Sequence, residues 1–239
     1  MSVSKRLIPR AKSVIVAADV EAEKLSELVR GTCLVKGIGG YKIGFELGLE
    51  QGLPKTVAVI KEETGLPVIY DHQKAGTDIP DTGESFAKVC KDSGVDAVIL
   101  FPFGGGETGP AWIKACQDKG LVVLVGAHMT QPKFLWEEGG VIHEGGPDRI
   151  FTLAAEEGVR NFVVPGNKVE YVLHYKELFE DMLGAGNFTL YAPGFITQGG
   201  EISDLAQVAG DNWHAIVGRE INKAVNFTEA AQQMTRQIR

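Results

Sequence analysis

The chain has 239 residues, of which 44% are hydrophobic and 23% are charged, as is ordinary for a soluble globular protein with a sizeable core. Its formal net charge of −7 argues against a broad nucleic-acid surface, although a local phosphate site needs only an arginine and a few backbone amides. No apolar run approaches the roughly 18–20 residues that span a bilayer, and no apolar segment follows the basic start as in a signal peptide. Cys33, Cys90 and Cys116 form no CxxC pair, so we expect reduced thiols in a cytoplasmic protein.

Eight short runs rich in valine, isoleucine and leucine recur along the chain at a fairly even spacing. Most are continuous rather than alternating, as expected for parallel strands that are covered on both faces. We predict strands over residues 13–19, 41–45, 67–71, 96–102, 121–127, 161–166, 189–193 and 214–218.

Segments with apolar residues at helical spacing lie between these runs. The segment 110–120 begins with Pro110 and ends at Gly120, which is the usual asymmetry between the start and the stop of a helix. By the same reasoning we predict helices over residues 20–31, 86–94, 110–120, 147–158, 169–184 and 219–238.

The alternation of strand and helix continues from one end of the chain to the other without a long linker or a change in composition. Eight such units in about 240 residues predict an α/β fold, a (β/α)8 TIM barrel that occupies residues 1–239 as a single domain. A doubly wound open sheet is the alternative, but it more often has five or six strands at this length.

Enzymes with this barrel place their active sites at the carboxyl ends of the strands. Polar or glycine residues at the predicted strand ends are therefore the candidates for a site. They are Asp19, Lys42, Asp71 with Lys74 and Asp78, Thr130, Gln198 with Gly199 and Gly200, and Gly218 with Arg219.

The segment DHQKAGTDIPDT at residues 71–82 places one lysine between two aspartates. Flanking carboxylates keep an ammonium group charged, and a positioned ammonium can donate a proton to a carbanion in a closed site. The alternative is a salt-bridged loop that opens a helix, with Asp78 or Asp81 as the N-cap.

The last two predicted strands end in features that suit a phosphate group. A glycine-rich segment, APGFITQGG, covers residues 192–200, and Gly218 and Arg219 stand at a predicted helix start. Barrels most often bind phosphate at this pair of strands, through backbone N–H groups and a basic side chain.

Taken in order, these segments resemble the orotidine 5′-phosphate decarboxylase family from Asp19 to Arg219. VIVAAD and YKIGFEL are similar to the family's first two strands, and DIPDT at 78–82 is similar to its DIPxT. MTQP at 129–132 resembles the end of its fifth strand, with Thr130 where serine is usual. APGFITQGGE and IVGREI resemble its closing sequences.

The resemblance implies decarboxylation of orotidine 5′-phosphate (OMP) to UMP in pyrimidine synthesis, without a metal or an organic cofactor. Lys74 would give its proton to the C6 carbanion, and Asp71 would lie near the leaving carboxylate. Asp78, with Ile79 and Thr82, would reach in from the partner subunit of a homodimer.

The remaining roles implied by the resemblance concern the ribose, the base and the phosphate. Asp19 and Lys42 would contact the ribose and order the charge network. Thr130 would read the edge of the pyrimidine. The residues that would bridge to or hold the phosphate are Gln198, Gly199, Gly218 and Arg219.

One departure from the family concerns the spacing around Lys74. The family pattern is Asp-x-Lys-x-x-Asp, whereas here two residues separate Asp71 from Lys74 and three separate Lys74 from Asp78. We therefore expect a bulge over residues 72–77 that still brings the ammonium between the two carboxylates.

Two other functions stay open at this point. A related barrel enzyme that acts on a sugar phosphate, a keto-gulonate phosphate decarboxylase or a hexulose phosphate synthase, would use Mg²⁺ and an acidic residue on its second strand. Here Lys42 falls near that place, and Glu46 follows. A non-catalytic binder of phosphate ligands is the second alternative. His72 and His128 fit no metal-ligand spacing, so we expect them to have roles in loops.

Overall fold

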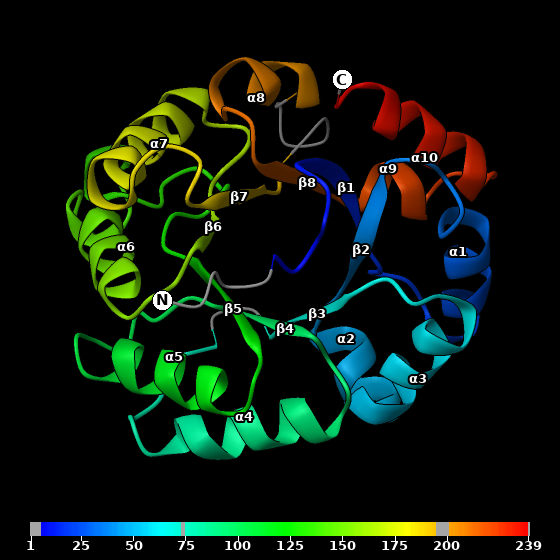
Figure 1. Cartoon of the computed structure of the whole chain (residues 1–239), viewed down its shortest axis with the longest axis horizontal. Helices are drawn as coiled ribbons and strands as arrows, with labels where there is room; N and C mark the ends of the chain where they lie inside the picture. Colours follow the sequence, from blue (N-terminus) through cyan, green and yellow to red (C-terminus); the bar gives the residue numbers. More distant parts are fainter. Residues whose placement is uncertain (1–5, 73–74, 195–200, 239) are drawn as a thin grey trace.

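In the computed structural model, eight parallel strands close into a barrel whose strand order follows the sequence. The structure describes residues 6–72, 75–194 and 201–238. Figure 1 looks down the barrel and shows the strands as an inner ring. The strands are β1 (Lys12–Ala17), β2 (Ile38–Ile43), β3 (Val68–Asp71), β4 (Ala97–Leu100), β5 (Val122–Gly126), β6 (Asn161–Val163), β7 (Thr189–Ala192) and β8 (Trp213–Val217). The predicted (β/α)8 barrel is therefore confirmed, and the open sheet is excluded because β1 pairs with β8.

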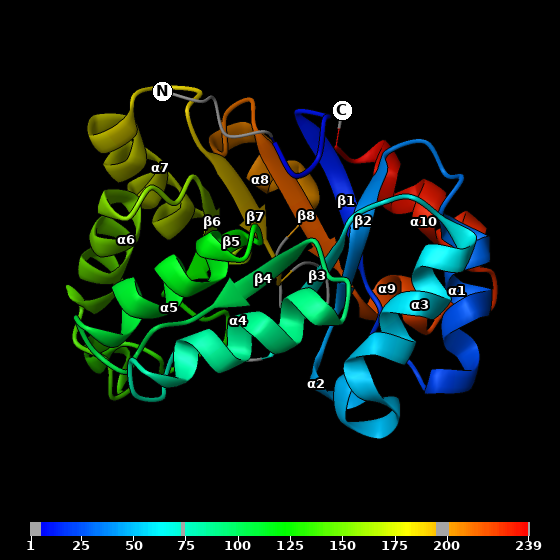
Figure 2. The same ribbon diagram turned by 60° about the horizontal axis from the view of Figure 1, so that its bottom comes forward.

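Helices surround this ring and carry the chain from each strand to the next (Figure 1). Figure 1 shows α1 between α3 and α10, and α1 contacts both helices. In Figure 2 the three helices lie on the outside of β1 and β2. The α-helices are α1 (Leu25–Thr32), α2 (Phe45–Leu47), α3 (Leu53–Glu63), α4 (Thr82–Asp92), α5 (Thr108–Asp118), α6 (Gly146–Glu156), α7 (Val169–Leu183), α8 (Ile202–Val208), α9 (Arg219–Asn222) and α10 (Phe227–Arg236). Two short 3-10 helices, Ala22–Lys24 and Trp136–Glu138, and one π-helical turn, Gly48–Gly52, complete them.

The apolar strand residues divide between two cores, which explains why the strands read as continuous apolar runs. In β1, Val14 and Val16 face the helices, whereas Ile15 and Ala17 face the inside of the barrel. This division follows from the two-residue period of a strand. Ile8, which precedes β1 and is buried, also packs in the inner core. The barrel is therefore a packed body rather than a pore, and a cavity can open only toward one of its ends.

Several boundaries differ from the sequence predictions. The second strand begins at Ile38 rather than at residue 41, since residues 38 and 40 already pair with β1. Its glycines hide this start from an apolar pattern, and a Cβ at Gly39 would overlap the Ser13 hydroxyl. Helices also follow β2 and β7, where the apolar pattern predicts none. The predicted helix over 219–238 is two helices, α9 and α10. The side chain of Asn226 ends the connection between them by accepting hydrogen bonds from the N–H groups of Thr228 and Glu229.

The three cysteines are free thiols, in agreement with the sequence analysis. Burial raises the pKa of both Cys90 and Cys116 to about 12, so these two thiols stay protonated at neutral pH. In the part of the chain that the structure describes, no helix is long and apolar enough to cross a membrane.

Candidate active site

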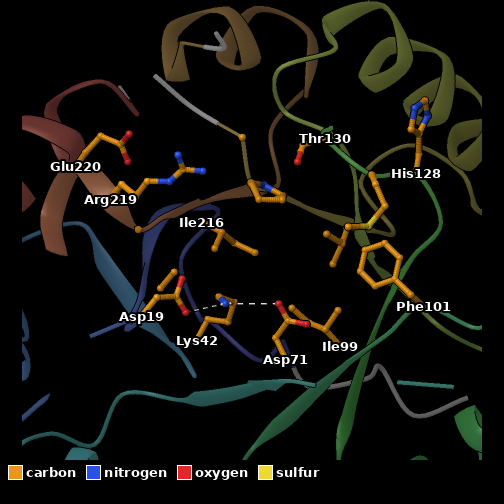
Figure 3. A pocket seen from close by; sticks show the side chains of 16 residues that line it. Asp19, Lys42, Asp71, Ile99, Phe101, His128, Thr130, Ile216, Arg219 and Glu220 are labelled. Atoms are coloured by element: carbon orange, nitrogen blue, oxygen red, sulfur yellow. Dashed lines mark hydrogen bonds and ion pairs between the residues drawn. The ribbon is translucent and has the colours of Figure 1, made fainter. Parts of the chain in front are cut away.

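A cavity of about 250 Å³ opens at the carboxyl ends of the strands. Figure 3 shows its polar side chains around an apolar floor, with Asp19, Lys42 and Asp71 on one side and Thr130 and His128 on another. The floor comes from the inner core of the barrel, through Ile99, Phe101, Val163 and Ile216. Gly126 is necessary for this floor, because a Cβ at that position would overlap the Phe101 ring. The cavity thus lies where the barrel fold predicts an active site.

Lys42 is the buried charge of the cavity. Its Nζ lies 3.3 Å from Oδ1 of Asp19 and 3.5 Å from Oδ2 of Asp71, and its side chain is only 7% exposed. Burial by itself lowers the pKa of Lys42, but the neighbouring charges of Asp71 and Asp19 outweigh burial and raise the pKa above its usual value. Lys42 is therefore a buried ammonium ion held between carboxylates that follow β1 and end β3.

The two aspartates of this group differ in exposure. The Asp71 side chain is 13% exposed and the Asp19 side chain is 46% exposed. Gly44 allows the close approach of Asp19 to Lys42, since a Cβ at Gly44 would lie 3.2 Å from the Asp19 carboxylate. With one ammonium and two carboxylates, the group carries a net negative charge toward the cavity, and a cation or a proton donor placed beside it would be stabilised.

The chain that follows β3 is anchored on both sides of residues 73 and 74. The hydroxyl of Tyr70 and Nδ1 of His72 form a hydrogen bond, and the carbonyl of Ala75 accepts a hydrogen bond of 2.7 Å from the N–H of Phe101. Gly76 adopts a φ of +94° against Pro102, a conformation that favours glycine. Lys74 itself lies outside the described residues, so its predicted position and the complete bulge over 72–77 stay predictions.

Arg219 lines the cavity from the end of β8, the strand next to β1. Gly218 precedes it at the end of β8, and both residues line the cavity, as does Glu220. Asn222 ties this corner to β1, because its Nδ2 donates a hydrogen bond of 2.8 Å to the carbonyl of Ala17. Arg219 therefore shares one cavity with the Asp19–Lys42–Asp71 group, and a Cβ at Gly218 would lie 3.6 Å from the Asp19 carboxylate. Gln198 and Gly199, which the sequence predicts beside this corner, lie outside the described residues, as does Gly200.

Thr130 lines the cavity from the segment after β5, as the sequence analysis predicts. His128 precedes it and is buried, with a hydrogen bond of 2.7 Å between its Nδ1 and the Tyr175 hydroxyl. Burial, with the nearby charge of Lys168, lowers the pKa of His128 to about 4, so this imidazole is neutral at physiological pH. Within residues 6–72, 75–194 and 201–238, no three His, Cys, Asp or Glu side chains gather as metal ligands would. His128 lies in the segment that follows β5 and lines the cavity.

The sequence was compared with models of known protein families. A family model described as "Orotidine 5′-phosphate decarboxylase / HUMPS family" matches residues 12–234, which is nearly the whole chain. The chain belongs to this family.

Relatives in the orotidine 5′-phosphate decarboxylase / HUMPS family that carry the decarboxylase name align over nearly the full length. The orotidine 5′-phosphate decarboxylase of Methanosarcina mazei is 32% identical over 234 residues, which cover 96% of each chain. The enzyme of the same name from Pyrococcus abyssi is 28% identical over 200 residues, covering 83% of this chain and 86% of the relative.

Solved structures with this name share the fold. The orotidine 5′-phosphate decarboxylase of Pyrococcus horikoshii superposes with a TM-score of 0.76 at 26% identity, over 94% of this chain and 98% of that one. The orotidine 5′-monophosphate decarboxylase of Methanocaldococcus jannaschii, complexed with the inhibitor BMP, gives a TM-score of 0.81 at 23% identity, over 96% and 99% of the two chains. The second likeness supports the barrel fold alone.

Three residues of the family-like DIPDT segment do not line this cavity. Asp78 and Ile79 border a separate hollow with residues 104–108, and Thr82 begins α4. Asp81 stands at the N-cap of α4, as the alternative interpretation of this segment predicts, but its side chain makes no capping hydrogen bond. Asp78 instead accepts a hydrogen bond of 2.7 Å from the N–H of Ile79, and Ile79 is 59% exposed.

Several residues near the site cannot be predicted from the sequence. Asn222 belongs to no recognisable motif. It ends α9, and its side chain donates a hydrogen bond to the Ala17 carbonyl of β1. Lys168 and Glu138 form an ion pair of 2.8 Å beside His128, although 30 residues separate them in the chain. No spacing rule joins such distant positions, so only the folded barrel reveals them.

Proposed function

We propose that this chain decarboxylates orotidine 5′-phosphate to UMP, as a carbon–carbon lyase that needs neither a metal nor an organic cofactor. One observation carries the proposal: the buried Lys42 ammonium lies between Asp19 and Asp71 in the same cavity that Arg219 and Thr130 line. This arrangement suits a substrate with a phosphate beside Arg219 and, at the other end, a flat ring that reacts next to a positioned proton donor. The names of the family and of the aligned relatives agree with it.

The substrate would span the cavity from Arg219 to Asp71. The phosphate would be held by the Arg219 guanidinium, by the backbone at Gly218, and by Gln198 and Gly199 of the β7 segment. The ribose hydroxyls would lie against Asp19 and Lys42, which are fixed by their ion pair. Thr130 would hydrogen-bond the edge of the pyrimidine, and the apolar floor would receive the flat ring.

The chemistry would take place at C6 of the orotate ring. The bond from C6 to the carboxylate breaks, CO₂ leaves, and the electron pair stays on C6 as a carbanion. Lys74 then transfers a proton from its ammonium group to C6, which yields UMP and a neutral amine. Asp71 and Lys42 would order this charge network, and a cation held beside the negative group would stabilise the carbanion.

A homodimer with shared sites would explain the position of Asp78. Asp78, Ile79 and Thr82 do not line the cavity of their own subunit, and Ile79 exposes an apolar side chain. In a dimer, Asp78 would complete the Asp71–Lys74 pair of the partner's site, with Ile79 and Thr82 beside it. We further propose a single domain over residues 1–239 and a cytoplasmic location, as expected for an enzyme of pyrimidine synthesis.

Two other functions are less well supported. A sugar-phosphate decarboxylase or aldolase of the same superfamily would need an acidic metal ligand on the second strand, but Lys42 occupies that strand's end. Glu46 is exposed and does not line the cavity. A non-catalytic phosphate binder would have no need for a buried ammonium that two carboxylates hold.

The ultraviolet absorbance of orotidine 5′-phosphate, followed with purified protein and EDTA, separates these functions. The proposal predicts that the absorbance changes from that of orotate to that of uracil at a rate that EDTA does not affect. Activity that EDTA abolishes would favour the metal-dependent sugar-phosphate branch. Unchanged absorbance together with tight binding of UMP would favour the non-catalytic phosphate binder.

A further inference from the structure

The segment that carries Thr130 is fastened by the loop that follows the next strand. The Nδ2 of Asn167, just before α7, donates a hydrogen bond of 3.0 Å to the backbone carbonyl of Thr130. This bond joins the β6–α7 connection to the β5–α6 connection, two segments 37 residues apart. It acts on the backbone of Thr130 and leaves the side chain directed to the cavity, as Figure 3 shows.

Lys168 adds a buried charge to this junction. Its Nζ lies 2.8 Å and 3.2 Å from the two carboxylate oxygens of Glu138 and 3.0 Å from Nε2 of His128. Only 12% of the Lys168 side chain is exposed. The ammonium therefore donates to the carboxylate and to the imidazole at once. This requires a neutral imidazole with its proton on Nδ1, which then donates to the Tyr175 hydroxyl at 2.7 Å.

Glu138, which Lys168 holds, also binds the backbone of the segment after Thr130. Its Oε2 accepts hydrogen bonds from the N–H of Phe134 at 3.0 Å and from the N–H of Leu135 at 3.4 Å. The Phe134 ring in turn stacks on the His128 ring, with centroids 5.2 Å apart and an interplanar angle of 20°. Thr130 thus lies between two positions, His128 and Phe134, that Lys168 holds directly or through Glu138.

We infer that Lys168 is a positioning residue that, with Asn167 and Glu138, fixes Thr130 against the pyrimidine side of the cavity. The inference rests on the proposed function, in which Thr130 contacts the base. Lys168 itself does not line the cavity, so its effect reaches the ligand through the β5–α6 segment. Its loss weakens recognition of the base and leaves recognition of the ribose phosphate unchanged.

The test compares two ligands, UMP and ribose 5-phosphate, which lacks the base. By calorimetric titration, Lys168→Met weakens UMP binding roughly tenfold, the size of one or two lost hydrogen bonds, and changes ribose 5-phosphate binding less than about twofold. Lys168→Arg, which keeps the charge, restores most of the UMP affinity. Lys176→Met is the matched control, because Lys176 pairs with Glu180 on α7 away from the cavity, and both affinities stay at wild-type values.

A double variant asks whether Lys168 acts through Thr130. Thr130→Ala alone weakens UMP binding, and adding Lys168→Met to it has little further effect, because the two changes remove the same contact. Full additivity of the two losses would overturn the inference. So would equal weakening of both ligands in Lys168→Met, or UMP affinity at the wild-type value. If Lys168→Met does not fold, Asn167→Ser gives the same comparison through the bond to the Thr130 carbonyl.

The proposed function and this inference fail in different ways. A wild-type protein that binds UMP without decarboxylating orotidine 5′-phosphate would overturn the function, while the two-ligand comparison would still decide the role of Lys168. An active wild-type enzyme whose Lys168→Met variant keeps its KM and its UMP affinity would overturn the inference alone. A wild-type protein that does not bind UMP would overturn both.

Discussion

Lys42 and Asp71, which stand at the ends of neighbouring strands, form an ion pair of 3.5 Å beneath the candidate active site. The pair is buried, with exposed side-chain fractions of 7% and 13%, and a second carboxylate from Asp19 shares the ammonium. A buried pair of this kind adds little net stability, whereas removing one partner leaves an uncompensated charge. The pair is therefore better explained by a function at the cavity than by stability.

Replacing Lys42 tests this interpretation. Lys42→Met leaves Asp71 and Asp19 without their shared cation, so we expect the free energy of unfolding to fall by about 3 kcal/mol at pH 7. Turnover of orotidine 5′-phosphate should fall as well, measured on protein shown to be folded by circular dichroism. Lys88→Met is the control, since Lys88 pairs with Asp92 on the exposed face of α4. Wild-type turnover in the folded Lys42→Met variant would remove Lys42 from the site.

Lys74 carries the proposed proton transfer. Lys74→Ala should lower kcat about 100- to 10,000-fold, the usual contribution of a general acid, while UMP still binds. Stopped-flow absorbance for turnover and calorimetry for UMP binding measure the two effects separately. Lys91→Ala on the exposed face of α4 provides the comparison. Near-normal turnover in Lys74→Ala would sink the assignment of Lys74 as the donor.

Arg219 is the proposed phosphate ligand. Arg219→Ala should weaken UMP binding roughly 100-fold, because charge-assisted hydrogen bonds to the phosphate contribute about 1.5–3 kcal/mol. Binding of uridine, which has no phosphate, should change little. Arg236→Ala, on the exposed part of α10, should leave both affinities unaltered. If uridine and UMP lose affinity equally in Arg219→Ala, the phosphate lies elsewhere.

Asp78 is proposed to act in the partner's site. Lys74→Ala and Asp78→Asn should each be inactive alone, but mixed dimers should regain about a quarter of wild-type activity, because half of the dimers contain one complete site. The activity is measured after the two variants are unfolded together and refolded in equal amounts. No recovery in demonstrably mixed dimers of the two inactive variants would mean that Asp78 serves its own subunit, and an active Asp78→Asn variant would show that Asp78 has no catalytic role.

The buried histidines give a pH dependence of stability. His214 lies inside the barrel with its Nδ1 2.8 Å from the Ser13 hydroxyl, and burial, with a smaller effect from Arg6, lowers its pKa to about 3. A folded-state pKa below the unfolded value of about 6.5 stabilises the fold at higher pH, and this stability is lost as the pH falls below about 6.5. His128, with a pKa of about 4, contributes in the same direction.

Urea unfolding at pH 7.5 and pH 4.5 measures this effect. We expect His214→Asn to reduce the loss of unfolding free energy between the two pH values by roughly 2 kcal/mol. His143→Asn, at an exposed position, should show the wild-type loss. An unchanged loss in His214→Asn would show that His214 is already charged in the folded protein at pH 4.5.

The sequence predicts the barrel well because each strand is an apolar run. The polar residues near the ends of these runs are then the candidates for the site. Asp19, Lys42, Asp71, Thr130 and Arg219 meet at one cavity for this reason. The sequence does not reveal that Lys42 is buried between two carboxylates, since nothing local distinguishes it from a lysine at a strand edge. It also misses the break at Asn226, because the apolar spacing continues from α9 into α10.

The groups that hold the site in place are the hardest to predict. Asn167 and Lys168 contact Thr130, His128 and Glu138 across 30 to 40 residues, and such contacts depend on how neighbouring βα loops meet. Their side chains would be equally acceptable on an exposed loop. Lys74 and Gln198, two of the site residues that the sequence predicts, lie outside the described residues, so their roles depend on experiment.

The central claim is that this chain removes CO₂ from orotidine 5′-phosphate and delivers a proton to C6. Proton NMR of the product formed in D₂O with EDTA tests it most directly, because the exchanged Lys74 ammonium would deliver deuterium. The account predicts UMP that carries deuterium at C6 and an ordinary proton at C5, formed together with an equal amount of CO₂. Orotidine 5′-phosphate recovered unchanged, from protein that is folded and binds UMP, would contradict it.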